Sequence, residues 1–329
     1  MRLSAGLVLI VGDNGVGKTN LLEAIHVGTQ GFSPRTRSDA QLIRLGEAAA
    51  AVSLSLTASR VEHAVEIRIT AASGRTAALD GSRLASTDVL RRTFPTLVFT
   101  PDRLSVIKGG PAVRRAYFDR VLSRLHPARA ALPGDYAATI LQRNAALRRV
   151  GYGLSPRSAL EPWTLRTAEL GAALVESRRS VIGALGAGFE ERLRELGLPG
   201  GALSYPSDAP TAAALERRLD ADIANGTTGI GPHRDDVLIE AGSRDLRGFG
   251  SQGQQRLALL ALLLAEAALL PSSPLLLLDD VLSELDARRR GVLARHIALL
   301  GQTLITATQR SALPAEPSQV VEVSPGQAR

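Results

Sequence analysis

The chain contains no cysteine and few aromatic residues. Its 329 residues include eleven aromatic rings, from six Phe, four Tyr and one Trp. The absence of cysteine excludes a disulfide framework, a thiolate metal site and a cysteine nucleophile, and it is compatible with a reducing compartment. With so few rings, stacking on the bases of a single nucleic-acid strand is not expected to be a main source of affinity.

The sequence also lacks an apolar run long enough to cross a bilayer. The longest leucine-rich stretch, residues 257–270, contains Glu266 and falls short of the roughly 20 apolar residues that a transmembrane helix needs. The N-terminal residues lead directly into a glycine loop and not into a small-residue cleavage site, which favours a strand over a signal peptide. With 45% hydrophobic residues, the chain is expected to fold as one large domain or two of ordinary size.

Positive charge is concentrated in one segment. The formal net charge is +7 at pH 7, yet residues 101–160 alone contain eleven basic and three acidic residues. A polyanion is therefore expected to bind here first, although a solvated helical surface would give the same pattern. Arginines suit phosphate contacts, which position a protein on a duplex without reading its sequence. The candidate DNA-binding residues are Arg114, Arg115, Arg143, Arg148 and Arg149.

Hydrophobic patterning predicts an α/β core built from both ends of the chain. Apolar or β-branched runs predict strands at residues 7–11, 96–100, 237–240, 275–278 and 303–306, and residues 51–70 alternate as in an antiparallel pair. Helices are expected from Lys18 and from Gly253. Residues 101–225 are expected to form a helical insertion between core segments 1–100 and 226–329. The tail after Pro314 contains Pro and Ser and is expected to be loosely ordered.

The glycine loop satisfies a nucleotide-binding pattern. Residues 12–19, GDNGVGKT, match GxxxxGK[ST] directly after an expected strand and before an expected helix, which is the context that this motif requires. Backbone N–H groups of such a loop converge on phosphate oxygens, the lysine reaches the β and γ phosphates, and the threonine hydroxyl binds Mg²⁺. The expected nucleotide-binding residues are Gly12, Asp13, Asn14, Gly15, Val16, Gly17, Lys18, Thr19 and Asn20.

A second motif, LLLLDD at residues 275–280, places two carboxylates at the end of a buried strand. The carboxyl ends of parallel strands are where open α/β sheets bind ligands. We expect Asp279 to hold Mg²⁺ together with Thr19, and Asp280 to be the base that polarises an attacking water. Taken alone, the acid pair could cap the following helix.

Two further motifs accompany the acid strand. GSQGQQR at residues 250–256 starts a helix, and its order in the chain resembles the signature motif of ABC-type ATPases, although a plain helix cap would have the same composition. The expected signature residues are Ser251, Gln252, Gly253 and Gln254. SELD follows the acid strand as a D-loop does in that superfamily, with Ser283, Glu284, Leu285 and Asp286.

Five longer stretches extend the likeness nearly from end to end. They are GVGKTNLLEAI (15–25), FTPDRLSVIKGGPAVRRAYFD (99–119), LQRNAALR (141–148), TGIGPHRDD (228–236) and DDVLSELDARRRGVL (279–293). The whole set resembles the RecF family of bacterial recombination mediators, which are relatives of the SMC-type heads among ABC-type ATPases. The stretches at 99–119 and 228–236 distinguish the RecF family from transporter subunits and chromosome-organising heads, which lack them.

The resemblance implies a fold and a function. It implies an α/β P-loop ABC-type ATPase head (lobe I, with a mixed sheet) carrying an inserted, mainly helical lobe II. ATP and Mg²⁺ would lie between two protomers, with Ser251 of one facing the Lys18 loop of the other. The dimer would act in the cytoplasm, bind duplex DNA next to a single-stranded gap, hydrolyse ATP slowly, and help RecR and RecO load RecA. The alternatives are a nucleotide-dependent scaffold with dispensable hydrolysis and, less favoured, a transporter's nucleotide-binding subunit.

Several features depart from the pattern of the RecF family or from that of ABC-type ATPases in general. Only ten residues precede Val11, where relatives normally have a β-hairpin, which predicts a start-site error or a truncation and altered contacts to the adenine. Many ABC-type ATPases have Glu where this chain has Asp280. An Asp at this place resembles the RecF family itself, and it fits slow hydrolysis. No switch histidine is evident at residues 303–309, and no Q-loop glutamine can be assigned.

Overall fold

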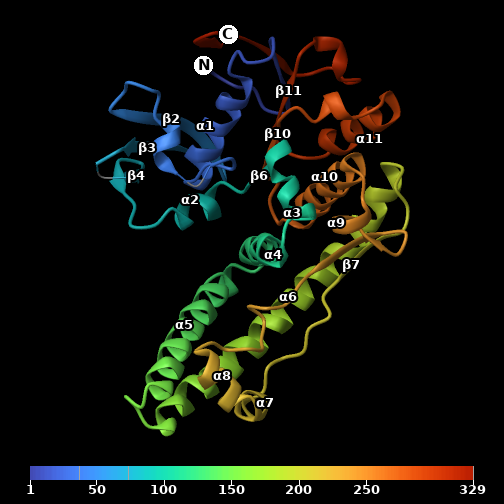
Figure 1. Cartoon of the computed structure of the whole chain (residues 1–329). Coiled ribbons are helices and arrows are strands. Elements are labelled where there is room, and N and C mark those ends of the chain that lie inside the picture. The colour runs from blue at the N-terminus through green and yellow to red at the C-terminus, as the bar shows by residue number, and fades with distance from the viewer. Residues whose placement is uncertain (37, 73, 329) are drawn as a thin grey trace. The chain divides into compact units, whose positions relative to one another are not determined.

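The computed structural model of the chain describes residues 1–36, 38–72 and 74–328. They form two compact units (Figure 1). Unit 1 consists of residues 1–104, 195–197 and 256–329, and unit 2 of residues 105–194 and 198–255. The second boundary differs from the expected position at residue 226, because residues 226–255 pair and pack with the insertion. None of the described helices has the length and apolar character needed to cross a membrane.

A mostly parallel sheet forms the centre of the described part of unit 1. Its strand order is β13-β12-β1-β11-β10-β6. Only the β12–β13 pair is antiparallel among the described pairings of this sheet. The strands are β1 (Leu7–Val11), β6 (Thr96–Phe99), β10 (Leu275–Leu278), β11 (Thr303–Ala307), β12 (Gln319–Ser324) and β13 (Gln327–Ala328). Nearly continuous burial along β1, β10 and β11 is typical of parallel strands covered on both faces.

The C-terminal tail belongs to this sheet, so the expectation of a loosely ordered tail was wrong. β12 runs parallel to β1, with Val8 opposite Gln319 and Val11 opposite Glu322. Val321 is fully buried in the same core as Val8. The polar residues of the tail gave no sign of a strand in the sequence. Val320, Val321 and Val323 are covered by packing against β1 and its core, and not because of a local pattern.

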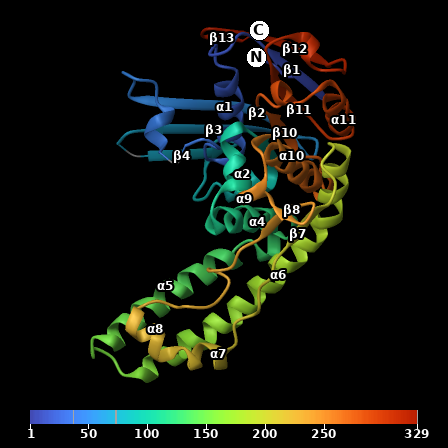
Figure 2. The same cartoon turned by 45° about the vertical axis from the view of Figure 1, so that its right-hand side comes forward.

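Helix α1 (Lys18–Gln30) lies between the parallel sheet and a second, antiparallel sheet. Leu22 and Ile25 pack in the core of the parallel sheet, and Val27 packs against the antiparallel one. The second sheet, in the order β2-β3-β4-β5, is visible beside α1 in Figure 2. Its strands are Ala49–Ala58, Val61–Thr70, Gly74–Leu79 and Ser82–Arg83, and the short α2 (Asp88–Thr93) follows them.

The opposite face of the parallel sheet carries helices from the C-terminal half. Figures 1 and 2 both place α10 (Gln252–Leu269) and α11 (Ala287–Ala298) on the side away from α1. The α10 residues from Leu257 to Ala265 are all buried, which explains why this helix is too apolar for a surface element. Unit 1 is therefore a layered α/β structure, as the sequence predicts.

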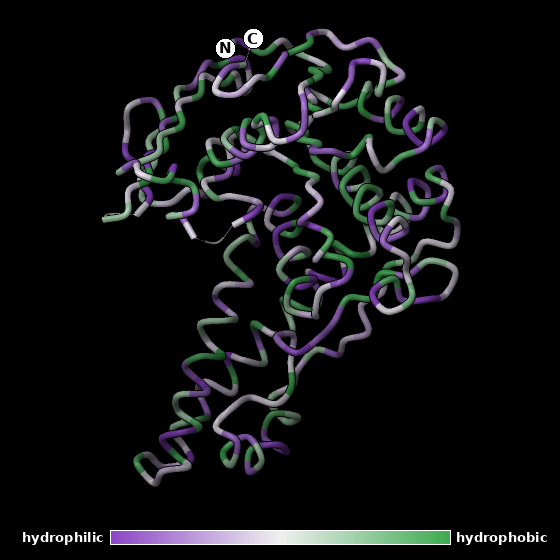
Figure 3. Tube along the Cα trace, turned by 45° about the horizontal axis from the view of Figure 1, so that its top comes forward, coloured by the Kyte–Doolittle hydropathy of each residue, from purple (hydrophilic) through white to green (hydrophobic). Residues whose placement is uncertain are grey.

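Unit 2 is mainly helical. Its long helices are α4 (Pro111–Leu125), α5 (Leu132–Gly151) and α6, which spans Glu161–Glu195 and whose last residue belongs to unit 1. In Figure 3 the trace of α5 and α6 alternates between hydrophobic and hydrophilic residues, as expected of amphipathic helices. Shorter elements are α3 (Ser105–Lys108), α7 (Ala212–Arg217), α8 (Leu219–Asn225) and α9 (Leu246–Phe249), with a small sheet of β7 (Gly201–Ser204), β8 (Leu238–Ala241) and β9 (Arg244–Asp245).

Candidate functional site

The glycine loop between β1 and α1 has the geometry of a phosphate-binding loop. Gly15 and Gly17 have φ values of 84° and 109°, in the left-handed region that glycine adopts at little cost. The Lys18 ammonium donates to the carbonyl oxygens of Gly12 and Asp13 at 2.6 and 2.8 Å. The loop thus brings backbone N–H groups, the positive end of the α1 dipole and an ammonium group to one place, which is the arrangement that binds phosphate.

The first residue of the acid pair is joined to this loop. The Thr19 hydroxyl lies 2.9 and 3.1 Å from the two carboxylate oxygens of Asp279, although 260 positions separate the residues. The Asp279 backbone N–H donates to the Phe99 carbonyl at 2.9 Å, which places the carboxylate at the end of β10. Burial raises the pKa of the Asp279 carboxyl above its ordinary value, and hydrogen bonds from Thr19 and Thr306 act in the opposite direction.

These oxygen atoms fit a magnesium ion. Mg²⁺ prefers hard oxygen ligands and is usually held by one or two carboxylates together with substrate phosphates. The Thr19 hydroxyl and the Asp279 carboxylate are such ligands, and a cation would offset the cost of burying the carboxylate charge. Within the described ranges, no group of three or more His, Cys, Asp or Glu side chains could hold a metal unaided. A bound nucleotide would therefore have to supply further ligands.

The second residue of the acid pair is held by its backbone. Asp280 has a φ of 50°, in the left-handed region that Asp adopts more readily than most residues. Its N–H donates to the Thr306 hydroxyl at 2.9 Å, and its carbonyl accepts from the Ser283 hydroxyl at 2.9 Å. Asp280 itself is exposed. Its carboxylate is thus available to a bound molecule while the main chain beneath it is held on both sides.

The expected signature residues lie in unit 2 at the start of α10. The Ser251 N–H donates to the Gln254 side-chain oxygen at 2.9 Å, and the Gln254 N–H donates to the Ser251 hydroxyl at 3.2 Å. This reciprocal pair is a capping box. Ser251, Gln252 and Gly253 are exposed. The cap explains the composition, and it also leaves the helix N-terminus open to an anion.

The SELD residues have distinct positions. Ser283 bonds Asp280 as described, and Leu285 is buried. Asp286 caps α11 by accepting the Arg289 N–H at 2.8 Å, and that hydrogen bond lowers the pKa of the Asp286 carboxyl. The Glu284 side chain lies outside the part that the structure describes. The motif thus joins the acid strand to the next helix.

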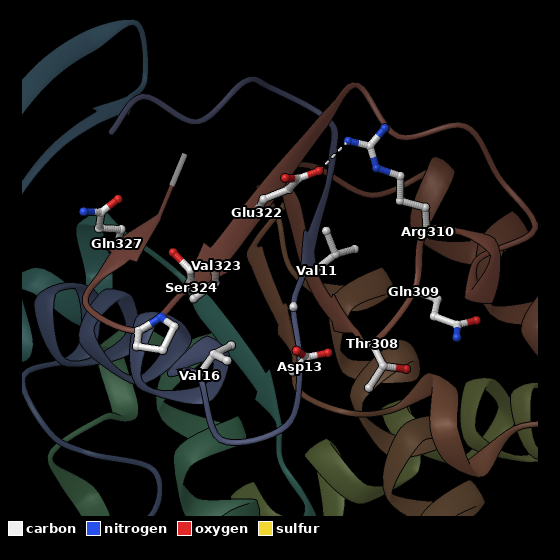
Figure 4. A pocket seen from close by; sticks show the side chains of 12 residues that line it. Val11, Asp13, Val16, Thr308, Gln309, Arg310, Glu322, Val323, Ser324 and Gln327 are labelled. Atoms are coloured by element: carbon white, nitrogen blue, oxygen red, sulfur yellow. Dashed lines mark hydrogen bonds and ion pairs between the residues drawn. The ribbon is translucent and has the colours of Figure 1, made fainter.

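A pocket of about 510 Å³ opens beside the start of the glycine loop (Figure 4). The exposed ion pair between Arg310 and Glu322, 2.9 Å long, lies at it. Its lining comes from the loop, from the residues after β11 and from the β12–β13 hairpin: Val11, Gly12, Asp13, Val16, residues 308–310, residues 322–325 and Gln327. The C-terminal strand therefore contributes to the surroundings of the nucleotide loop.

Two of the five candidate DNA-binding arginines are structural. Arg114 is fully buried and forms a bidentate pair with the Asp236 carboxylate. Arg143 is also fully buried and donates to the Asp222 carboxylate at 2.9 Å. Guanidinium groups enclosed in this way cannot reach the phosphates of DNA, so the expectation was wrong for both. Their carboxylate partners lie far along the chain, and the local charge pattern gave no sign of them.

The other three candidates differ in exposure. Arg115 is half-buried and donates to the Asp235 carbonyl at 2.5 Å, and burial lowers the pKa of its guanidinium. Arg148 and Arg149 are exposed on α5. The Arg148 guanidinium donates to the Gly226 carbonyl at 3.3 Å, and that of Arg149 donates to the Ser155 hydroxyl at 3.2 Å. Arg148 and Arg149 thus remain available for phosphate contacts.

The GPHRDD turn is rigidly held. The His233 imidazole lies 2.9 Å from the Tyr136 hydroxyl and 3.0 Å from the Thr228 carbonyl, and Asp235 accepts the Tyr205 hydroxyl at 2.7 Å. Burial lowers the pKa of the His233 imidazole. These contacts favour a role for His233 in stabilising the turn over one in orienting a phosphate, while Arg234 beside it is exposed.

Sequence reasoning missed two residues beside the acid strand. The Thr306 hydroxyl donates to the Asp279 carboxylate at 2.9 Å, in addition to accepting the Asp280 N–H. Arg35 pairs with Glu23 at 3.2 Å and with Asp102 at 3.5 Å. Its positive charge acts to lower the pKa of the Asp279 carboxyl, against the larger effect of burial. Neither residue belongs to a local motif, because each is brought to the site by strand order or by a loop after α1.

Comparison with known proteins agrees with this geometry. The model of the RecF/RecN/SMC N-terminal domain family matches residues 1–328. The DNA replication and repair protein RecF of Acidothermus cellulolyticus is 34% identical over 347 aligned residues, covering 98% of this chain and 94% of that protein. RecF of Heliobacterium modesticaldum is 35% identical over 329 residues, covering 94% and 88%.

Solved structures show the same likeness. The structure of the recombination mediator protein RecF with ATP, in the RecFOR pathway, has a TM-score of 0.87 at 28% identity and covers 100% of this chain and 92% of that one. An SMC head bound to the C-winged helix domain of ScpA has a TM-score of 0.60 at 19% identity, a likeness of fold alone. The fold and the site define the class of the protein as a P-loop ATPase head of the ABC and SMC type. Within that class, the chain belongs to the RecF family.

Proposed function

We propose that the chain is an ATP-dependent DNA-binding protein of recombinational repair. ATP binds at the Lys18 loop with Mg²⁺ and joins two copies of the chain, with Ser251 of one copy facing the loop of the other. The joined state binds duplex DNA next to a single-stranded gap and acts with RecR and RecO to load RecA. The proposal takes nucleotide and pathway from the RecF relatives. The observation that carries it is the contact of Thr19 with Asp279.

Each residue of the nucleotide site has a separate role in hydrolysis. When bound, Mg²⁺ would be held by Thr19 and Asp279 and would neutralise charge on the phosphates. Lys18 exchanges the carbonyl oxygens of its own loop for phosphate oxygens and holds the triphosphate in place. Asp280 accepts a proton from the attacking water. Aspartate is one methylene shorter than the glutamate common in ABC-type ATPases, and this fits slow hydrolysis that times the release of DNA.

The chain offers a matched pair for the first test, because Lys18 and Lys108 are its only lysines. Lys108 is exposed at the end of α3 in unit 2. Light scattering should show a dimer of the wild type in Mg-ATP that retains a gapped duplex. Lys18→Ala should stay monomeric and lose ATP affinity by calorimetry, whereas Lys108→Ala should behave as the wild type. An unchanged affinity of Lys18→Ala would reject the proposed site.

Hydrolysis distinguishes the proposed ATP-dependent DNA-binding dimer from a nucleotide-dependent scaffold. Asp280→Asn should bind ATP and accumulate as the dimer, because the nucleotide persists. A variant that turns over ATP at the wild-type rate would remove Asp280 from the mechanism. A wild type that dimerises without hydrolysing ATP would favour the scaffold.

The DNA surface is tested with the exposed arginines. Reversing both Arg148 and Arg149 to Glu should weaken duplex binding and reduce the slope of log K against log salt by about two units if both contact phosphates. The matched control reverses Arg166 and Arg179, which are exposed on α6 and pair with Glu169 and Glu176. Equal losses in the two double variants would show a nonspecific effect of net charge.

A further inference from the structure

A buried threonine of β11 hydrogen-bonds both residues of the acid pair, the carboxylate of Asp279 and the backbone N–H of Asp280. Thr306 is 1% exposed, and its hydroxyl lies 2.9 Å from an Asp279 carboxylate oxygen and 2.9 Å from the Asp280 backbone nitrogen. The strand order β1-β11-β10 explains the contact, because β11 lies directly between the P-loop strand and the acid strand.

The hydrogen-bonding capacity of the hydroxyl matches this position. A threonine hydroxyl has one proton to donate and lone pairs to accept. Here the proton goes to Asp279, and a lone pair receives the Asp280 N–H. Valine has the same shape and could make neither bond. Replacement would remove one hydroxyl donor from the buried Asp279 carboxylate, which Thr19 would still contact, and would leave the Asp280 N–H without its acceptor.

We propose that Thr306 is a positioning residue for ATP hydrolysis, which orients the Asp279 carboxylate toward the magnesium ion and fixes the Asp280 main chain in its left-handed conformation. The inference rests on the proposed function, since it assigns a role within the same nucleotide site. Thr306 is buried and acts through these two neighbours. Residues that orient a metal ligand in this way typically contribute about 10- to 100-fold to metal affinity or activity.

The same strand provides a control. Thr303 is fully buried at the start of β11, and its hydroxyl has no hydrogen-bond partner among the described residues. Thr303→Val therefore makes the same chemical change in the same strand without removing a contact. Thr306→Ser keeps the hydroxyl and removes only the methyl group. The three variants separate the hydrogen bonds from packing.

The first measurement is Mn²⁺ affinity in the presence of a non-hydrolysable ATP analogue, followed by electron paramagnetic resonance. Thr306→Val should weaken Mn²⁺ binding by about 10- to 100-fold, while Thr306→Ser and Thr303→Val stay within a few-fold of the wild type. In steady-state assays, kcat of Thr306→Val should fall by a similar factor, with little change in the affinity for ATP measured without metal, because Lys18 and the loop are intact.

The outcomes are distinguishable. Wild-type Mn²⁺ affinity and kcat in Thr306→Val would overturn the inference, and so would a Thr306→Ser variant as impaired as valine, since packing would then be the cause. If Thr306→Val does not fold, Thr306→Ala removes the same hydroxyl without a branched side chain and is held to the same expectations. A wild type that binds no ATP would instead reject the proposed function, and the inference with it.

Discussion

The buried arginine of α5 offers a decisive prediction about unit 2, because its sequence suggests a DNA contact and its surroundings a structural role. In Arg143→Met, the Asp222 carboxylate loses a donor at 2.9 Å and Thr228 one at 2.7 Å. Asp222 is only 1% exposed. Removing one partner of a buried ion pair typically costs about 3–5 kcal/mol, because the remaining charge stays buried.

The expected cost lies near the lower end of that range, about 3 kcal/mol. The Gly229 N–H, 3.1 Å from Asp222, continues to solvate the carboxylate. The Nη2 atom of Arg143 is buried without a hydrogen-bond partner among the described residues, so its removal costs little. Methionine also keeps most of the apolar volume of the arginine stem.

Urea denaturation followed by tryptophan fluorescence measures this loss, because the single tryptophan, Trp163, lies on α6 next to Thr164, a neighbour of Arg143. The double variant Arg143→Met/Asp222→Leu should recover most of the stability, since it leaves no buried unpaired charge and Arg218, the other partner of Asp222, is exposed. DNA binding by Arg143→Met should keep the wild-type salt dependence. An unchanged urea midpoint together with a salt slope reduced by about one unit would show that Arg143 contacts a phosphate, and would refute the structural role.

Three further predictions concern the nucleotide site and the GPHRDD turn. Asp279→Asn should raise the thermal unfolding temperature of the nucleotide-free protein at pH 7 while abolishing hydrolysis, because burial raises the pKa of this carboxyl and its charged form therefore destabilises the fold; a lower unfolding temperature would contradict this. Burial lowers the pKa of the His233 imidazole from its ordinary value of 6.5. The contribution of His233 to stability should therefore be complete above about pH 6.5 and decline at lower pH, because the unfolded chain takes up the proton more readily. In calorimetric scans, the unfolding temperature of His233→Gln should depend less on pH between 6.5 and 5 than that of the wild type. Gly12→Ala would place a Cβ atom 2.4 Å from the Val323 carbonyl oxygen, so ATP affinity and the unfolding temperature should both fall, as calorimetry can test.

The nucleotide loop and the acid strand could be located from sequence because their signals are local. GDNGVGKT contains its own turn, and four leucines before Asp279 mark a buried strand at any position in the chain. Thr306 could not be found in this way, since its role depends on β11 lying beside β10, and the order of strands is a property of the whole sheet. The connection is visible only once the strands are paired.

The prediction that Arg114 and Arg143 contact DNA was wrong for a related physical reason. A charged residue is assigned to the surface unless a buried partner is known, because burying an unpaired charge is costly. The partners of Arg114 and Arg143 lie 122 and 79 positions away, in segments with ordinary acidic content. Tertiary pairing thus decides whether an arginine is exposed. The surplus of positive charge in residues 101–160 was correctly counted, but it does not identify the residues that reach solvent.

The order of strands in the parallel sheet also constrains how the chain is made. Leu7 lies opposite Thr303, and Val8 lies opposite Gln319, so the P-loop strand leaves the ribosome long before either of its partners exists. Pairings of such high sequence separation form late and slowly, whereas the contacts within unit 2 all lie between residues 105 and 255 and can form earlier during synthesis. The nucleotide loop should therefore acquire its shape only when the last strands arrive. A chain released before β12 would leave β1 as an edge strand of the parallel sheet and would lack the β12–β13 hairpin that lines the pocket beside the glycine loop.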